Sequence, residues 1–431
     1  VGDLPAMDDA LLDGSRPLAS PSVLHGILRI GLPVCLQMMV SVGSGLIVFV
    51  ILGRSAEEEV LAGFALANVL CNLLGRWLLY GLGAGFDTIA AQAWGARDYR
   101  MLGVVGQRVA LIMLVGICVP MTPIWWFASP ILETIGQPRA VADQASVYAR
   151  ISLPGFYAMA FGCVLTKALL AMGKARVVML SGILGECTMV GLLVVLVVTP
   201  CQLGLKGAAI ASVASNLTQA LTLLVGAVLD ADCRRCWPGL TKEALRGWRA
   251  YLRLGIPACL MLLAEALSWE VVTFLAGLTT TATGSDTFEP KAIIAAQGIL
   301  QSTMAVTYCV PQGICRGAAT VIGNAVGAGD VACAARASRL ALGIGAVAVI
   351  TQVLGLTLLR MPLVDAYGAP PNTSAVLVKM MPLTAGFLLA DGLQMCLTGI
   401  ITGAGKQAVT GPILIIAYFV LGLPAGAGLA F

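Results

Sequence analysis

Two acidic residues stand inside long apolar stretches, where a charge is costly. Glu265 lies eight residues after Pro257 in IPACLMLLAEALSWEVVTFLAGL, and Asp391 lies in LTAGFLLADGLQMCL. An apolar environment disfavours the charged form of a carboxyl group, so such a group can take up and release a proton as its access to water changes. We therefore expect Glu265 and Asp391 to bind a coupling ion, with a structural hydrogen-bonded acid as the alternative for each. Two acids close together can also share a proton or hold Na⁺.

Further residues in the same stretches are candidates for contact with a substrate. Trp269 follows Glu265 by one helical turn on the same helix face, whereas Glu270 lies about 140° round the helix. Tyr308 precedes the break at Pro311 and can offer its ring to an organic cation. Packing inside the membrane is the more common role of a single aromatic residue, so Tyr308 keeps both interpretations.

Enzymatic chemistry finds little support. The chain has one histidine, His25, which is too few for a histidine cluster around a metal, and no Ser/His dyad for acyl transfer is recognised in the sequence. Most of its 13 cysteines lie in apolar runs and act as small hydrophobes, and only Cys233 and Cys236 form a CxxC pair. A metal or redox role for this pair is weighed against reduced cytoplasmic thiols that can be acylated. We expect no enzymatic activity, no metal and no cofactor.

Helices in a membrane must position these residues. Of 431 residues, 58% are hydrophobic and 11% are charged, compared with roughly a quarter charged in an ordinary soluble domain. A helix needs about 20 apolar residues to cross the hydrocarbon core, and a barrel would show short alternating segments instead. The sequence therefore predicts an all-α polytopic membrane protein. Its eleven apolar runs lie at residues 24–52, 60–90, 101–129, 145–172, 175–199, 205–229, 248–278, 292–322, 332–359, 375–402 and 407–431.

Basic residues gather on alternate loops. Arg97, Arg100 and Arg108 follow the second run, and six more Lys and Arg lie between Arg234 and Arg253, whereas the intervening loops carry mostly single basic residues. Because Lys and Arg concentrate on the cytoplasmic side, we expect a cytoplasmic N-terminus. The net charge of +4 then reflects topology, and no nucleic-acid partner is expected.

The sequence repeats itself. Six helices are an even number, so two copies enter the membrane from the same side, as parallel repeats do, with a substrate site expected in the cleft between them. We expect two six-helix lobes related by pseudo-twofold symmetry, with the last helix missing. AQAWGARD (91–98) returns as GNAVGAGD (323–330) and PILETIGQP (130–138) as PLVDAYGAP (362–370), each 232 positions later, and LRIGLPVCL (28–36) returns as LRLGIPACL (252–260), 224 positions later.

The repeat sets the expected domain bounds. They are a cytoplasmic N-terminal segment (1–23), a first lobe (24–229), a cytoplasmic inter-lobe linker (230–247) and a second lobe (248–431).

Local roles follow for residues outside the acidic pair. Gly95 and its neighbouring alanines are expected to allow a tight turn, and Asp87 is expected to orient Arg97 or Arg100. Lys167 and Glu186 interrupt other apolar runs, and a pair between them is weighed evenly against a functional role.

Four strings resemble the multidrug and toxic compound extrusion (MATE) family, its eukaryotic branch in particular. They are FDTIAAQAWGARDYRMLGVVGQR, GLKGAAIA, YCVPQGI followed by GNAVGAGD, and DGLQMCLTGIITGAGKQ, and the resemblance covers residues 24–431. It implies twelve helices, with Glu265 and Asp391 at the positions of two coupling acids in the second lobe. It also places Gln37 and Asn68 at cavity positions, where interhelical hydrogen bonding is the alternative, and Glu270 matches a family glutamate. The chain departs from the family in ending near the eleventh helix and in carrying Arg76 and Arg316.

The resulting expectation is a secondary antiporter. It would export xenobiotics, organic cations or secondary metabolites in exchange for protons. Coupling to protons gives the transport cycle a direction, because the ion binds the two conformations unequally. We expect a monomer in the plasma or vacuolar membrane. The alternatives are a lipid-linked glycan flippase, for which Arg76, Lys167 and Arg316 would supply a basic cavity, and a truncated remnant that does not transport.

Overall fold

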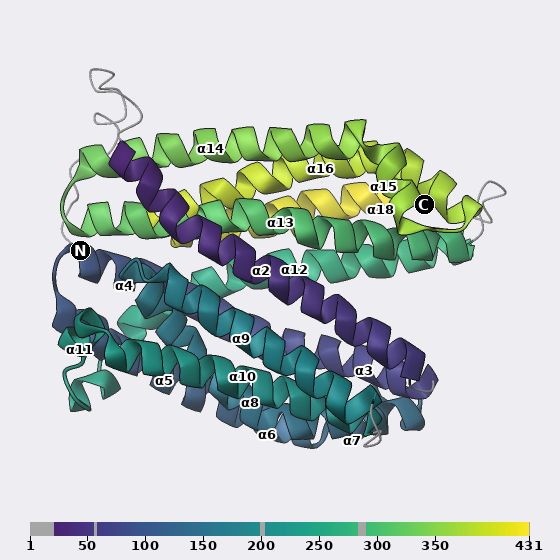
Figure 1. The fold of residues 1–431 in the computed structure, drawn as a ribbon, viewed down its shortest axis with the longest axis horizontal. Coiled ribbons are helices and arrows are strands. Elements are labelled where there is room, and N and C mark those ends of the chain that lie inside the picture. The colour runs from purple at the N-terminus through teal and green to yellow at the C-terminus, as the bar shows by residue number, and fades with distance from the viewer. Residues whose placement is uncertain (1–20, 56–57, 199–202, 283–289, 431) are drawn as a thin grey trace. The chain divides into compact units, whose positions relative to one another are not determined.

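The protein is built from long helices (Figure 1). The computed structural model describes residues 21–55, 58–198, 203–282 and 290–430, and every regular element within these ranges is helical. Ten of its helical stretches are long and apolar enough to cross a membrane. The run predicted at 292–322 forms part of another long helix, α13. The predicted all-α membrane class is confirmed.

The helices fall into two sets, connected by α2 (Pro21–Ser55) and α12 (Trp248–Ala282). The first set comprises α3 (Glu58–Cys71), η1 (Asn72–Arg76), α4 (Trp77–Gly95), α5 (Tyr99–Met113), η2 (Leu114–Cys118), α6 (Val119–Trp126), α7 (Ala128–Thr134), α8 (Arg139–Ala171), α9 (Ala175–Leu193), η3 (Val194–Val198), α10 (Gly204–Leu229), α11 (Ala231–Cys236) and η4 (Lys242–Leu245). The second set comprises α13 (Pro290–Gly327), α14 (Val331–Leu358), α15 (Arg360–Tyr367), α16 (Pro371–Ala404), α17 (Gln407–Ile415), η5 (Ile416–Gly422) and α18 (Leu423–Ala430).

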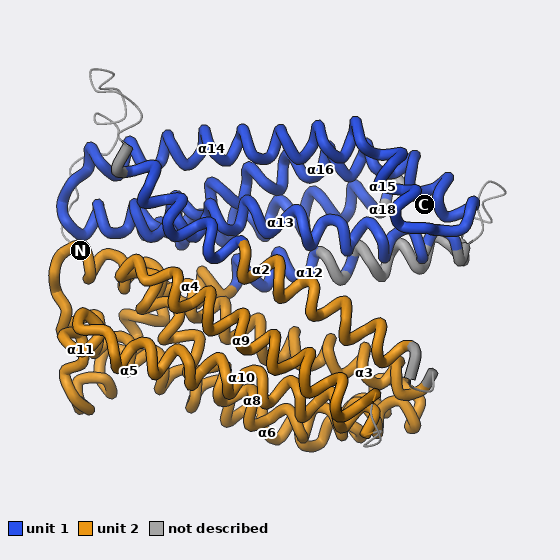
Figure 2. The backbone as a smooth tube through the Cα atoms, in the orientation of Figure 1, with its two compact units in different colours: residues 1–35, 260–431 blue, residues 36–259 orange. Residues whose placement is uncertain are grey.

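The chain packs as two compact units whose borders lie inside helices (Figure 2). One unit holds residues 1–35 and 260–431, and the other holds residues 36–259. These borders differ from the bounds of 24–229 and 248–431 expected from the repeat, since the first part of α2 belongs to the unit of α13 and the first part of α12 belongs to the unit of α4.

Glycines explain why α2 and α12 divide in this way. A Cβ added at Gly313 of α13 would lie 2.9 Å from the Cβ of Cys35, and a Cβ added at Gly81 of α4 would lie 2.7 Å from the Cα of Cys259. These two contacts join corresponding positions of the repeat. Backbones approach closely only where a side chain is absent. The glycines therefore allow the first part of α2 to pack against α13 and the first part of α12 to pack against α4.

The repeat is also visible in the turns. Asp98 caps α5 by accepting a hydrogen bond from the Met101 amide (2.9 Å), and Asp330 caps α14 in the same way from the Cys333 amide (2.8 Å). The residue before each cap has a positive φ, which is 59° at Arg97 and 74° at Gly329. The tight turn expected at Gly95 and its neighbouring alanines follows directly after Gly95, which is the last residue of α4, and its left-handed residue is Arg97. The amides of Arg97 and Asp98, after Gly95, donate hydrogen bonds to the last carbonyl groups of α4.

Candidate ion-coupling site

Glu265 is buried inside its unit, where two helices meet. It lies on α12 with 8% of its surface exposed, and the hydroxyl of Tyr308 on α13 donates a hydrogen bond to its Oε1 atom at 3.1 Å. The Ser268 hydroxyl donates to the backbone oxygen of Glu265 at 2.7 Å, which satisfies that hydroxyl locally. Tyr308 thus contacts the first predicted acid directly, so the structure brings these two site residues together.

Asp391 belongs to the same polar region. It lies on α16, is 5% exposed, and its Oδ2 atom has no hydrogen-bond partner among the described residues. The Tyr308 hydroxyl also lies 3.9 Å from the sulfur of Met395, which follows Asp391 by one helical turn. Tyr308 therefore stands between α12 and α16, and Asp391 is close enough to Glu265 for their negative charges to repel.

Polar residues that the sequence analysis did not single out extend this region. The Tyr418 hydroxyl, in the π-helical segment η5, donates to Oε1 of Gln394 at 3.1 Å. The Gln394 Nε2 atom and the Gln312 Oε1 atom are buried without partners in the described part of the chain. Their signal in the sequence was their spacing, because Gln394 follows Asp391 by three residues and Gln312 follows Tyr308 by four.

The arrangement can bind a small cation. Buried polar atoms are nearly always paired, so carboxylate and amide oxygens left without a partner call for a proton, an ion or water. Oxygen atoms from two carboxyl groups suit H⁺ or Na⁺. The described residues contain no group of three His, Cys, Asp or Glu side chains placed to hold a metal ion.

Four further residues were predicted to contact a substrate. The side chains of Trp269 and Glu270 fall outside the described residues. Gln37 and Asn68 belong to the other unit. There a Cβ added at Gly182 would lie 2.4 Å from the Gln37 Cγ, and the Asn68 amide donates to the Phe64 backbone oxygen of its own helix at 3.2 Å. Gln37 therefore packs against α9.

The charges buried in this other unit pair differently from the expectation. Lys167 on α8 contacts Asp87 on α4, with 2.6 Å between Nζ and Oδ2, and the two side chains are 5% and 11% exposed. Glu186 instead accepts a hydrogen bond from the Ser44 hydroxyl. Of the two alternatives weighed for Lys167 and Glu186, the pair between them is wrong. The Lys167 side chain lies against Gly83 of α4, one helical turn before Asp87, and so reaches Asp87 instead.

Two other predicted roles change with this pairing. Asp87 was expected to orient Arg97 or Arg100, but it pairs with Lys167, and Arg100 forms an ion pair with Glu243 of the linker at 2.8 Å. Because Asp87 neutralises Lys167, Lys167 no longer supports the basic cavity of a flippase. Arg76 donates to Asn72 one turn earlier at 3.0 Å.

A family model, curated relatives and a solved structure all match this chain to the same family. The MatE family model matches residues 33–197 and 257–427. Protein DETOXIFICATION 16 of Arabidopsis thaliana is 30% identical over 86% of this chain and 74% of its own length. Multidrug and toxin extrusion protein 2 of Oryctolagus cuniculus is 30% identical over 88% of this chain and 61% of its own length. The crystal structure of the eukaryotic MATE transporter AtDTX14 superposes with a TM-score of 0.85 at 24% identity, covering 95% of this chain and 89% of that one.

Proposed function

Because the chain belongs to the multidrug and toxin extrusion (MATE) family of transporters, we propose that it exports organic solutes in exchange for protons. The observation that carries the proposal is the Glu265 carboxyl group, buried on α12 and hydrogen-bonded by Tyr308, with Asp391 near it on α16. A membrane interior makes such charges costly, so they are kept where they bind something.

Proton binding gives the site two charge states. With Glu265 and Asp391 ionised, the region is negative and attracts a cation. A proton taken up from the acidic side removes that attraction and releases the bound solute, and loss of the proton to the other side restores it. The cycle has a direction because the proton and the solute bind the two states unequally. Organic cations are therefore the substrate class that this site favours.

The division into two units supports alternating access. The borders at residues 35 and 259 fall two residues after Pro33 and Pro257, each of which lies inside a helix. A proline within a helix removes a backbone hydrogen bond and makes a local kink easier. Both connecting helices thus carry a place to bend where the packing changes from one unit to the other. We further propose a monomer in the plasma or vacuolar membrane, with a cytoplasmic N-terminus.

Uptake into proteoliposomes tests the proposal. Protein reconstituted with an acidic interior should accumulate a labelled quaternary ammonium cation, and Glu265→Gln and Asp391→Asn should reduce that uptake to the level of protein-free liposomes. Asp365→Asn, an exposed acid of the same unit, is the matched control and should transport like wild type. A Na⁺ gradient without a pH gradient distinguishes the two coupling ions, and labelled citrate tests for anions.

The result that would contradict the proposal is pH-driven uptake at the wild-type rate by the Glu265→Gln/Asp391→Asn double variant. Loss of uptake in the Asp365→Asn control as well would show that the assay responds to any lost carboxyl group.

A further inference from the structure

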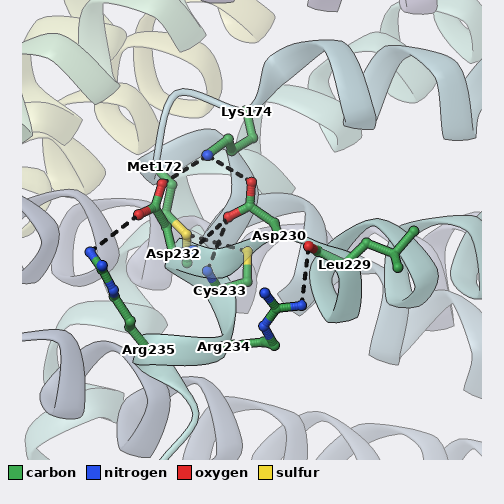
Figure 3. Close-up of polar contacts among 8 residues, drawn as sticks. All are labelled: Met172, Lys174, Leu229, Asp230, Asp232, Cys233, Arg234 and Arg235. Atoms are coloured by element: carbon green, nitrogen blue, oxygen red, sulfur yellow. Dashed lines mark hydrogen bonds and ion pairs between the residues drawn. The ribbon is translucent and has the colours of Figure 1, made fainter.

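The linker between the two copies is fastened to one end of its unit. Lys174, in the turn between α8 and α9, donates to Oδ2 of Asp230 at 2.7 Å and to Oδ2 of Asp232 at 2.8 Å (Figure 3). Asp230 also caps α11 by accepting from the Cys233 amide at 3.1 Å. Partial burial alone would raise the pKa of Asp230, but these hydrogen bonds hold it below its ordinary value. The start of the linker is thereby fixed over the ends of α8 and α10.

A second set of contacts fastens the linker to α5. The Gln107 amide donates to the Gly239 backbone oxygen at 2.8 Å, and its oxygen accepts from the Thr241 amide at 3.2 Å. Gly103 of α5 lies so close to the linker that an added Cβ would be 1.9 Å from the Cys236 backbone oxygen. Between these attachments the linker forms a strap, residues 230–245, across α5, α8 and α10.

An apolar cavity of about 1000 Å³ lies under the strap. Its walls are lined by α5, α8, α10 and the strap itself. Small residues on the three facing helices leave the space open, among them Gly106 and Ala110 of α5, Ala168 of α8 and Ala227 of α10. The volume is at the upper end of the range for ligand pockets. α5, α8 and α10 belong to helical stretches that are long and apolar enough to cross a membrane, so lipid is available to the unit that contains the cavity.

The strap contributes basic and apolar groups to the same cavity. Arg234 and Lys242 both line it. Arg234 donates through Nη1 to the backbone oxygens of Val228 and Leu229, and Figure 3 shows the second of these contacts. Its guanidinium group is thereby held at the cavity wall. Trp237 and Leu240 line it too and are 58% and 90% exposed. Exposed aromatic and aliphatic residues beside basic ones are typical of the membrane interface.

We propose that this cavity binds an anionic phospholipid, with an acyl chain between α5, α8 and α10 and the headgroup phosphate at Arg234 and Lys242. Charge complementarity favours this occupant, because residues 230–253 contain six Lys and Arg against three Asp and Glu. Two of those acids are held by Lys174 and the third, Glu243, by Arg100. Basic pockets between membrane helices on the cytoplasmic side bind anionic headgroups, and that side is the predicted location of the strap.

A chain attached covalently to the cysteines of the strap is the competing occupant. Cys233 and Cys236 both line the cavity. Burial raises the pKa of the Cys233 thiol to about 12 and that of Cys236 to about 11. The thiolate is the reactive form, so both are poor nucleophiles. This favours a free lipid over a thioester.

Lipid retention tests the proposal. Native mass spectrometry of the purified chain should show one phosphatidylserine retained more tightly than phosphatidylcholine, by on the order of tenfold. Gly106→Leu should abolish this retention by filling the cavity, because Gly106 lines it and an added Cβ there makes only ordinary contacts, the nearest 3.5 Å from Phe86. Gly116→Leu, further along the same span where nothing lies nearer than 3.9 Å to an added Cβ, is the matched control and should bind like wild type. Lys242→Gln should weaken phosphatidylserine binding and leave phosphatidylcholine unchanged.

Cross-linking locates the lipid independently. Phosphatidylserine with a photoreactive acyl chain should label peptides of α5 and α8 in wild type and in Gly116→Leu, but not in Gly106→Leu. The proposal is overturned by equal retention in Gly106→Leu and wild type, by labelling outside the cavity, or by an acyl mass on Cys233 or Cys236. Export measured on the same variants remains a separate result, because none of these residues belongs to the acidic site.

Discussion

At the scale of single residues, the two units treat the same helix positions differently. Asp87 and Lys167 form a buried ion pair between α4 and α8. Their counterparts 232 positions later are Ala319 and Gly399, on α13 and α16. There a Cβ added at Gly399 would lie 2.5 Å from the Cys315 backbone oxygen, so the helices meet through their backbones. One unit joins these helices by charge and the other by the absence of side chains.

Removing one member of the ion pair should therefore destabilise the protein strongly. Lys167→Met removes the ammonium group that neutralises the buried Asp87 carboxylate, which costs about 3–5 kcal/mol. Thermal unfolding in detergent should show a clear loss. The double variant Asp87→Leu/Lys167→Met should recover most of it, because both buried charges are then replaced by apolar side chains. A single variant as stable as wild type would mean that water reaches Asp87.

At the scale of helices, close packing through glycine decides which unit each segment joins. Gly317 of α13 faces the first part of α2, where an added Cβ would lie 2.4 Å from the Ile27 backbone oxygen. A backbone atom cannot move aside as a flexible side chain can, so this position admits no larger residue without displacing α2.

Gly317→Ala should cost about 1–3 kcal/mol by overpacking this contact. The matched control is Gly343→Ala on α14, where no atom lies within 4 Å of an added Cβ. That change should be neutral or stabilising by up to about 1 kcal/mol, because alanine favours a helix more than glycine does. Unfolding temperatures of the two variants in the same detergent provide the measurement, and equal values would contradict the packing argument.

The strap should respond to pH through its fastening. The Asp230 pKa is held below its ordinary value, so the contribution of this group is complete above the unfolded value of about 3.9 and is lost as pH falls through the lower folded value. The hydrogen bonds that Lys174 donates to Asp230 and Asp232 raise the pKa of Lys174, so its contribution is lost only above about 10.4.

Hydrogen exchange of residues 230–240, corrected for intrinsic rates, should thus stay constant between about pH 5 and 9 and rise below about pH 4. Lys174→Met should raise it already at pH 7, and Lys206→Met, an exposed lysine at the start of α10, should not. Exchange in Lys174→Met that matches wild type at pH 7 would mean that Gln107 alone holds the strap.

At the scale of the whole molecule, the topology can be tested on one unit. The strap and the turn before α8 lie at its opposite ends, near α11 and α7 respectively (Figure 1). In intact cells, Lys242→Cys should be protected from a membrane-impermeant maleimide, whereas Gln137→Cys should react. Permeabilised cells should label both above the wild-type background. The reverse pattern would place the N-terminus outside, contrary to the distribution of Lys and Arg.

The sequence by itself determined the fold class, the helix positions and the family. Long apolar runs have one solution in lipid, because backbone groups must be satisfied within each segment. It also singled out Glu265 and Asp391, since an isolated acid in such a run is conspicuous, and Tyr308 three residues before Pro311, where α13 continues without the expected break. The matching turns at Arg97 and Gly329 were visible in the sequence as a repeat, because the hydrogen bonds of a turn depend on the residues of the turn itself.

Only the tertiary structure decided which side chains meet. Lys167 pairs with Asp87 and not with Glu186, and Gln394 and Tyr418 join the acidic region, because helix rotation and tilt determine contacts between residues far apart in the chain. The exchange of the first parts of α2 and α12 between the units depended on which glycines face each other. The cavity under the strap is likewise a property of three helices packed together, which the periodicity of a single helix does not contain.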